Sequence, residues 1–333
     1  MIRVGVLRGG PSEEYGVSLA TGEHVLSYLR STALKDKYHT IDILIDKNGA
    51  WHVGGLPTSL EQLHLKVDLI INALHGAYGE DGKVQQQLDE WNIPYTGSTA
   101  FASAQSMHKG LAKDALARAG IKTPFHIIMP AWATSDTTLT RREYTDAYAR
   151  EVFNRMAPSW IVKPVASGSS DRVCLAKTLP DLAEILFLLS EAPEDFMIEE
   201  YIEGREVTIG FIEGFRGEEL YMLPIIEIQK QKGGVHGYSE KYETPARKYM
   251  GTFDEKEKQA LSQVVNATYR GLGLSHYGTV DIIFHPKRGP YVLEANSLPG
   301  LTQVSLFPHA LDAVGAQMSE FIEHLIQLAK ENK

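Results

Sequence analysis

The sequence predicts an α/β fold built from α+β subdomains, and two stretches near the ends of the chain indicate it most clearly. Residues 2–7 form an apolar, strand-forming run that leads into a glycine turn at 9–12 and an amphipathic segment at 17–30. A strand, a glycine turn and a helix in this order begin an α/β unit. Residues 278–296 hold two β-rich runs around a turn with Pro and Gly, which indicates an antiparallel hairpin.

Length, charge and cysteine content limit the classes of protein that this chain can be. Its 333 residues predict two or three domains, because a domain typically holds about 100–200 residues. The net charge of −9 argues against a nucleic-acid or membrane-surface partner. A single cysteine, Cys174, excludes an intrachain disulfide and fits a reducing cytosol. Neither a signal peptide nor an apolar run near the roughly 20 residues of a membrane span is evident.

Further strands and helices are expected to complete the first unit. The strands are predicted at 40–46, 67–74 and 93–96, with a short helix between the first two and another helix at 83–90. Together with the opening strand and helix, this alternation is typical of a sheet covered by helices.

Two polar segments of this unit are candidate ligand contacts. The motif HGAYGEDG lies between a strand and a helix, at the edge where α/β sheets bind ligands, so His75 and Glu80 are candidates. Alternatively, Glu80 and Asp81 merely begin the helix. Glu13 and Glu14 precede the first helix, whose dipole favours ionised acids. Such a carboxylate could hold a substrate ammonium, or both could serve only the helix start.

The middle of the chain has features of a phosphate site. A helix at 98–119 carries Lys109, and strands at 159–164 and 173–177 flank the small-residue loop VASGSSDR. Such a loop can fold over phosphates with N–H and hydroxyl donors, although the Gly-Lys-Thr ending of a Walker loop is absent. Lys163, just before the loop, could supply charge. The alternatives are a solvated Lys109 and a flexible Ser/Gly turn.

The last third combines strands, helices and one long irregular segment. Remaining helices are predicted at 141–156, 179–190, 254–271 and 310–330, and remaining strands at 196–202, 205–211 and 220–228. Glu199 and Glu200 lie in a strand, where acids are depleted. One is expected to face outward and the other to accept a hydrogen bond from a ligand amine, such as that of adenine. Residues 229–251 show no period and are long enough for a lid.

The hairpin at the end of the chain predicts a metal site. If its turn is centred on 287–288, Asp281 lies opposite Glu294 and Thr279 opposite Asn296. Residues two apart share a face, and opposite residues have Cβ atoms about 4.5–5.5 Å apart. Two carboxylates and an amide oxygen on one patch suit Mg²⁺, which takes further ligands from a phosphate. The alternative is a polar, solvent-facing hairpin without a ligand.

Seven motifs occur in a recognisable order across nearly the whole chain. They are GGPSEEYGVS, HGAYGEDG, SMHK, VKPVASGSS, EEYIEGRE, EKY and VDIIF with LEANSLPGLTQVSLFP. Together they resemble the D-alanine–D-alanine ligases of the ATP-grasp superfamily. The resemblance implies an ATP-grasp fold with an N-terminal Rossmann-like domain. It implies a substrate-covering domain at 1–98, a central subdomain with the phosphate loop at 99–195, and a C-terminal subdomain at 196–333 with lid loop 229–251 and the metal site.

The resemblance also implies an ATP-dependent, ADP-forming carboxylate–amine ligase. ATP phosphorylates the carboxylate of one D-alanine, and the amine of a second attacks the acyl phosphate, giving a dipeptide for peptidoglycan synthesis and cell-wall formation. The implied cofactors are ATP and Mg²⁺ (or Mn²⁺), with two ions. The implied setting is a cytoplasmic homodimer that acts on small molecules, with neither a nucleic-acid nor a membrane partner.

By resemblance, individual residues receive roles at the nucleotide end of the site. The three oxygen donors of the hairpin match the metal ligands. Lys109 and Lys163 match lysines on the ATP phosphates, and Lys241, in the lid, matches a lysine that reaches the γ-phosphate. Glu199 matches an adenine contact, and Glu206 matches a ribose contact.

Other residues receive roles at the amino-acid end. A triad orients the first D-alanine, and its members are matched by Glu14, Ser169 and Tyr242. Glu14 takes the substrate ammonium, and His75 lies beside the same substrate. The Gly300 N–H matches an oxyanion donor, and Ser305 matches a contact to the carboxylate of the second substrate.

Two of the departures from the pattern of the family bear on catalysis. Thr279 stands where the family has an arginine that stabilises the reacting groups, and Arg172 stands where the phosphate loop has a glycine. Loss of one donor at developing charge typically costs about 10²–10³ in rate. Two alternatives therefore stand beside the ligase: a ligase for a different amino-acid pair, and a nucleotide-binding homologue with weak or lost catalysis.

Overall fold

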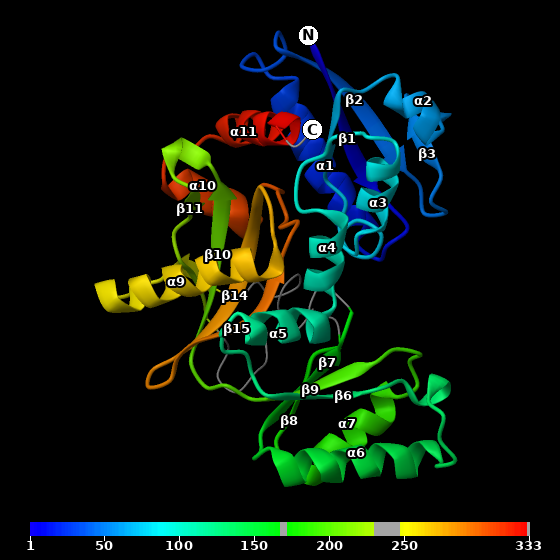
Figure 1. Cartoon of the computed structure of the whole chain (residues 1–333), viewed down its shortest axis with the longest axis vertical. Coiled ribbons are helices and arrows are strands. Elements are labelled where there is room, and N and C mark those ends of the chain that lie inside the picture. The colour runs from blue at the N-terminus through cyan, green and yellow to red at the C-terminus, as the bar shows by residue number, and fades with distance from the viewer. Residues whose placement is uncertain (167–171, 230–246, 332–333) are drawn as a thin grey trace.

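The computed structural model describes residues 1–166, 172–229 and 247–331, which form three sheets with their covering helices (Figure 1). The N-terminal unit lies at one end of the molecule and the central unit at the other, with the C-terminal sheet between them. Among the described residues, no helix combines the length and apolar character that crossing a membrane requires.

The N-terminal unit has a five-stranded sheet in the order β4-β3-β2-β1-β5. Its strands are β1 (Ile2–Gly9), β2 (Tyr38–Ile45), β3 (Trp51–Val53), β4 (Leu56–Pro57) and β5 (Leu69–Asn72), and its helices are α1 (Tyr15–Leu29), α2 (Leu60–His64) and α3 (Lys83–Glu90). Gly9 ends β1 with φ +91°, and an added Cβ would lie 2.2 Å from the Ile45 carbonyl oxygen. Only glycine therefore permits this sharp turn into α1.

Two details of this unit differ from the sequence prediction. Residues 93–96 are not a strand, because the segment makes only an isolated bridge between Ile70 and Tyr95. The short strands β3 and β4 were not predicted; they pair antiparallel at the edge of the sheet. Three and two residues are too few to show a hydrophobic period.

The central unit pairs its strands in the order β6-β9-β7-β8. Its elements are α4 (Ala100–Met107), α5 (Lys109–Arg118), β6 (His126–Met129), η1 (Trp132–Thr134), α6 (Arg141–Arg155), β7 (Trp160–Pro164), β8 (Cys174–Ala176), α7 (Leu179–Leu189) and β9 (Phe196–Glu200). The single helix predicted at 98–119 is wrong: His108 is extended, and its ring accepts a hydrogen bond from the Leu111 N–H to begin α5. Helices α6 and α7 begin with capping boxes, Thr140 with Glu143 and Thr178 with Asp181.

The C-terminal sheet has the order β13-β12-β10-β14-β15, with β11 also paired to β10. Its elements are β10 (Arg205–Glu213), η2 (Phe215–Gly217), β11 (Leu220–Met222), β12 (Ile226–Gln229), β13 (Arg247–Met250), α9 (Glu255–Leu272), β14 (Tyr277–His285), β15 (Gly289–Asn296), α10 (Leu306–Ala313) and α11 (Met318–Glu331). The predicted pairs are confirmed, with Asp281 opposite Glu294 and Thr279 opposite Asn296. The turn, however, is centred on Lys287, and a register shift between Asp281 and Ile282 produces these pairs.

Two predicted elements in this unit are each divided in two. The strand expected at 220–228 is β11 and β12, separated around Pro224, which has no N–H to donate to a sheet. The helix expected at 310–330 is α10 and α11, and Gly315 between them has φ +66°. A residue in this left-handed region ends a helix, and glycine occupies it at little cost.

The end of the chain packs into the first unit. Helix α11 lies beside the N-terminal unit (Figure 1) and shares one buried core with α1 and β14. Tyr277, Phe307 and Phe321 form its aromatic centre, with ring centroids 5.1–5.7 Å apart. This core fixes the glycine turn after β1 relative to the hairpin of β14 and β15.

We predict that Phe321→Ala destabilises the whole protein. The side chain is fully buried against rings of the C-terminal unit, in a core that it shares with α1 of the N-terminal unit, so its removal should lower the free energy of unfolding by about 3–5 kcal/mol. Denaturant unfolding followed by fluorescence measures the change. Phe101→Ala is the matched control, because Phe101 is 75% exposed and should change the free energy by less than about 0.5 kcal/mol. Equal effects of the two substitutions would contradict the shared core.

Candidate active site

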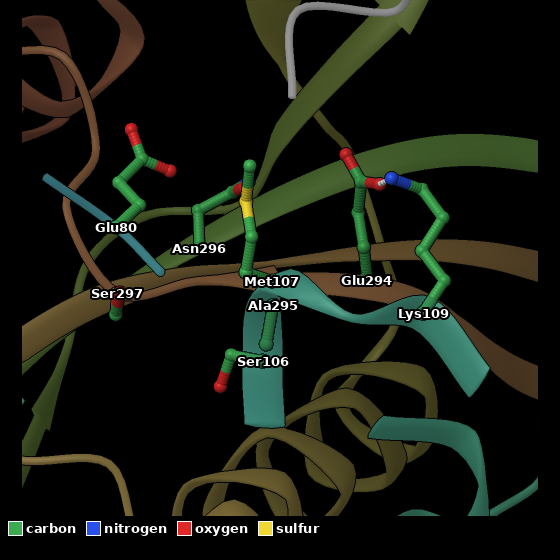
Figure 2. Close-up of a pocket in the computed structure, with 8 residues that line it drawn as sticks. All are labelled: Glu80, Ser106, Met107, Lys109, Glu294, Ala295, Asn296 and Ser297. Carbon is green, nitrogen blue, oxygen red and sulfur yellow. Dashed lines mark ion pairs between the residues drawn. The ribbon is translucent and has the colours of Figure 1, made fainter. Parts of the chain in front are cut away.

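A pocket forms where the three units meet (Figure 2). One wall comes from the N-terminal unit, one from the junction of α4 and α5, and one from the end of β15. Its lining residues are Glu80, Ser106, Met107, Lys109, Glu294, Ala295, Asn296 and Ser297. Figure 2 shows Lys109 reaching Glu294 at one side of the pocket, with Asn296 and Glu80 toward the other side.

The hairpin brings the predicted oxygen donors together. The Thr208 hydroxyl donates to Asp281 Oδ1 at 2.6 Å. The Asn296 amide donates to Asp281 Oδ2 at 3.3 Å and to Thr279 Oγ1 at 3.4 Å. Glu294 lies directly opposite Asp281. A carboxylate pair and an amide are therefore held on one face by hydroxyl and amide donors.

This donor set fits a divalent cation. Two carboxylates and an amide carbonyl are hard oxygen ligands of the kind that bind Mg²⁺ together with phosphate oxygens. The ammonium of Lys109 lies 3.5 Å from Glu294 Oε2, so one carboxylate of the set already attracts a positive charge. Asp281, Glu294 and Asn296 are the residues that could hold the metal.

Buried lysines from two elements converge beside the metal residues. The backbone N–H of Lys109, at the start of α5, donates to the Val165 carbonyl at 2.9 Å, which joins α5 to the end of β7. Lys163 Nζ, in β7, lies 2.9 Å from Glu199 Oε2. Lys113 Nζ, one turn along α5, lies 2.9 Å from Glu199 Oε1. The structure thus brings Lys109 and Lys163, the two lysines predicted to bind phosphate, close to Glu199, the predicted adenine contact.

The ion pairs of this cluster favour the charged forms of Lys163 and Glu199. Burial would lower the pKa of Lys163, but the carboxylates of Glu199 and Glu294 outweigh burial and raise that pKa. Burial would raise the pKa of Glu199, but Lys113 and Lys163 lower it to about 2. Burial lowers the pKa of Lys109, although Glu294 opposes this effect. The cluster can therefore present a fixed ammonium to an anion.

Sequence reasoning missed two residues of this site. Lys113 follows Lys109 by four positions, so both side chains lie on one helix face; this spacing was the available signal. Thr208 lies opposite Asp281 in the pairing of β10 with β14. No local pattern marks Thr208, because its role depends on which strand lies beside it.

The two polar segments of the N-terminal unit meet at the other side of the pocket. Glu14, His75 and Glu80 each place a ligand atom within 4.8 Å of the others. His75 is buried; its Nε2 lies 2.8 Å from Thr21 Oγ1 and its Nδ1 lies 3.4 Å from Glu80 Oε1. Asp81 accepts a hydrogen bond from the Lys83 N–H and begins α3. The predicted helix-start role is thus confirmed for Asp81, whereas Glu80 lines the pocket.

The loop after β15 holds two further predicted residues. Ser305 Oγ accepts from the Thr302 N–H at 3.2 Å, and a Cβ added to Gly300 would lie 2.9 Å from that oxygen. His24, in α1, donates from Nδ1 to the Leu301 carbonyl at 2.5 Å. The first unit therefore holds this loop in place.

The remaining predicted residues are distributed as follows. Glu206 lies in β10, opposite Ile283 of β14. Glu200 is half-buried and accepts from the Phe125 N–H at 3.1 Å, so of the adjacent pair it is Glu199 that faces the lysines. Ser169, Lys241 and Tyr242 lie outside the described residues.

Comparisons with known proteins give a consistent result. A family model described as D-ala D-ala ligase C-terminus matches residues 125–327, and one described as D-ala D-ala ligase N-terminus matches residues 55–98. The D-alanine–D-alanine ligase of Pelotomaculum thermopropionicum is 33% identical over 99% of this chain and 98% of its own. That of Aquifex aeolicus is 33% identical over 98% and 100%.

Solved structures agree in fold. The Bacillus anthracis D-alanine–D-alanine ligase complexed with ATP has a TM-score of 0.78 and 28% identity, covering 100% of this chain and 98% of its own. The VanG D-Ala:D-Ser ligase of Enterococcus faecalis has a TM-score of 0.82 and 26% identity, covering 98% and 99%.

We predict that Thr208→Val weakens divalent-cation binding. The change keeps the shape of the side chain but removes the 2.6 Å hydrogen bond to Asp281, and loss of such a support typically reduces metal affinity about 10–100-fold. Titration of Mn²⁺ in the presence of ADP, with free Mn²⁺ read by EPR, measures the affinity. Thr145→Val is the control, because that buried hydroxyl bonds only carbonyls of α6 among the described residues. Unchanged Mn²⁺ affinity in Thr208→Val would contradict the assignment.

Proposed function

The chain belongs to the D-alanine–D-alanine ligase family, and from that premise we propose how the residues of its site divide the reaction. It is an ATP-dependent ligase of the ATP-grasp fold that joins two D-alanine molecules, with Mg²⁺ as its metal, in the synthesis of peptidoglycan precursors. One observation carries this conclusion: the oxygen donors Glu294 and Asn296 of β15 line one pocket together with the buried Lys109, and Lys163 is buried nearby on Glu199.

The reaction has two chemical steps. The γ-phosphoryl group of ATP passes to a carboxylate oxygen of the first D-alanine, leaving ADP and an acyl phosphate. The amine of the second D-alanine then attacks the carbonyl carbon, loses a proton, and phosphate departs. Phosphoryl transfer of this kind depends mainly on positioning and charge neutralisation.

At the nucleotide end, Lys109 and Lys163 bind the phosphates. Their burial and their carboxylate partners fix where the ammonium groups lie. Glu199 contacts adenine, and Glu206 contacts the ribose. The hairpin donors hold the metal ions, which neutralise phosphate charge and act as a template when bound. Lys241 reaches the γ-phosphate from the lid.

At the amino-acid end, Glu14 binds the ammonium of the first D-alanine, and His75 lies beside it. Their closeness to Glu80 gives this side of the pocket a negative character that favours an ammonium group. The Gly300 N–H donates to the developing oxyanion, and Ser305 binds the carboxylate of the second substrate. Two residues beyond the described part of the chain, Ser169 and Tyr242, complete the triad with Glu14.

A second candidate is a ligase that takes a different second amino acid. Thr279 is only 5% exposed and accepts a hydrogen bond from Asn296, so a neutral hydroxyl occupies a position next to the metal residues. The structural relative described as a D-Ala:D-Ser ligase spans the same fold. A ligase of this type would bind the nucleotide in the same way and would differ in how it binds the second amino acid.

Domain limits and assembly are also part of the proposal. We place the domains at 1–98, 99–195 and 196–333. The N-terminal and C-terminal sheets fall within the first and third ranges, whereas strand β9 (Phe196–Glu200) of the central sheet lies just past the second range. We further infer a homodimer in the cytoplasm, acting on small molecules. Light scattering of the purified chain tests the dimer.

We predict D-alanine-dependent phosphate release. The protein is incubated with Mg–ATP and a panel of D- and L-amino acids, and phosphate and dipeptide are measured by colorimetry and mass spectrometry. D-alanine alone should give phosphate and D-alanyl-D-alanine in equal amounts. Turnover that requires a second, different amino acid would favour the other candidate. Nucleotide binding without turnover on any acid would contradict both ligase assignments.

We predict that Thr279→Arg raises kcat. An arginine at this position on β14 would add a cation beside Asp281 and Asn296, where charge develops, and a missing donor there is worth about 10²–10³ in rate. Thr279→Ser is the control, since it keeps the hydroxyl that Asn296 contacts, and its kcat should stay unchanged. If Thr279→Arg fails to raise kcat or lowers it, Thr279 is not simply a lost charge.

A further inference from the structure

Lys113 is a buried cation that the proposed reaction does not use directly. Its side chain is 1% exposed, and it is not among the described residues that line the pocket. Its ammonium lies 2.9 Å from Glu199 Oε1 and 3.5 Å from the Pro124 carbonyl. A charged group is rarely buried so completely unless it is paired, so its function must lie in the groups that it contacts.

Glu199 divides its two carboxylate oxygens between lysines from different elements. Oε2 lies 2.9 Å from Lys163, in β7, and Oε1 lies 2.9 Å from Lys113, in α5. The carboxylate side chain is 3% exposed, so neither pair is screened by water. Two ammonium groups on one carboxylate leave the trio with a net charge of one positive unit. Without Lys113, Glu199 alone would cancel the charge of Lys163.

We propose that Lys113 is a positioning residue for phosphate binding. It forms an ion pair with one oxygen of Glu199, so that Lys163 shares the carboxylate with a second ammonium group. Lys163 then directs its remaining N–H donors to the phosphates. An ammonium has three donors, and one of them meets Glu199 Oε2. This inference rests on the proposed function, because it requires that Lys163 binds phosphate.

A purely architectural role makes different predictions. If Lys113 only anchored α5 to β9, its loss would weaken stability and would affect both substrates alike. If it sets the charge of the trio, its loss acts on phosphate binding and depends on the Glu199 carboxylate. The two roles can therefore be distinguished by comparing the binding of phosphate ligands with that of D-alanine, and by a double-mutant cycle.

The test compares Lys113→Met with the unmodified chain. Methionine is similarly long and unbranched but carries no charge. Binding of Mg²⁺–tripolyphosphate, which lacks adenine and ribose, is measured by calorimetry, together with KM for ATP and for D-alanine. We expect tripolyphosphate affinity to fall about tenfold and KM for ATP to rise by a similar factor, a coupling of the size found between contacting charged residues. The KM for D-alanine should stay within about twofold.

The cycle adds Glu199→Gln and the double variant Lys113→Met/Glu199→Gln. Without the carboxylate there is no charge to share, so Lys113→Met should change tripolyphosphate affinity by less than about threefold in this background. The same loss in both backgrounds would overturn the proposal. Lys113→Arg keeps the charge and should retain most of the affinity, which gives a readout even where Lys113→Met fails to fold.

Controls separate this inference from the function on which it rests. Lys258→Met removes one positive charge from the exposed surface of α9 and should leave tripolyphosphate affinity unchanged. If the unmodified chain makes dipeptide while Lys113→Met binds tripolyphosphate normally, the inference is wrong and the function stands. If the unmodified chain binds neither ADP nor tripolyphosphate, the proposed function falls and the inference with it.

Discussion

The antiparallel register of β14 and β15 is the constraint on which the site depends. Side chains alternate between the two faces of a strand, so a slip of one residue between β14 and β15 would put Asp281 and Asn296 on opposite faces of the sheet. The apolar side of the same hairpin prevents that slip, because Val280, Ile282 and Val292 are fully buried in the core beneath α9. The hydrophobic effect on one face therefore fixes the positions of the oxygen donors on the other.

The remaining parts of the pocket reach this hairpin through a few directed contacts between elements. The Lys109 N–H meets the Val165 carbonyl and joins α5 to β7. His24 meets the Leu301 carbonyl and joins α1 to the loop after β15. Glu199 joins α5 to the central sheet through its lysines. Each contact pairs a charged or polar group with a partner on another element, so these elements are held in a defined arrangement around the pocket.

The sequence alone could predict a feature when the residues that determine it lie close together in the chain, and could not when they lie far apart. The pairing of Asp281 with Glu294 was predicted correctly, but it depends on a register shift between Asp281 and Ile282 as well as on the local turn. The contact of Lys113 with Glu199 joins residues far apart in the chain, so it requires knowledge of how α5 packs on β9. The helix break at Gly315 was missed because apolar residues continue on both sides of it. The break between β11 and β12 was also missed, although Pro224 marks it in the sequence.

The shared core of α1, β14 and α11 has a consequence for how the chain folds during synthesis. The first hundred residues leave the ribosome early. Leu26 and Leu29 of α1 are fully buried in a core that they share with Phe321 of α11, and α11 is synthesised much later. Protein synthesis adds about 5–20 residues per second, so this apolar surface stays incomplete for tens of seconds. The N-terminal unit is thus expected to be a client of chaperones during translation, and a fragment cut at residue 98 would expose an apolar surface that later residues of the chain cover.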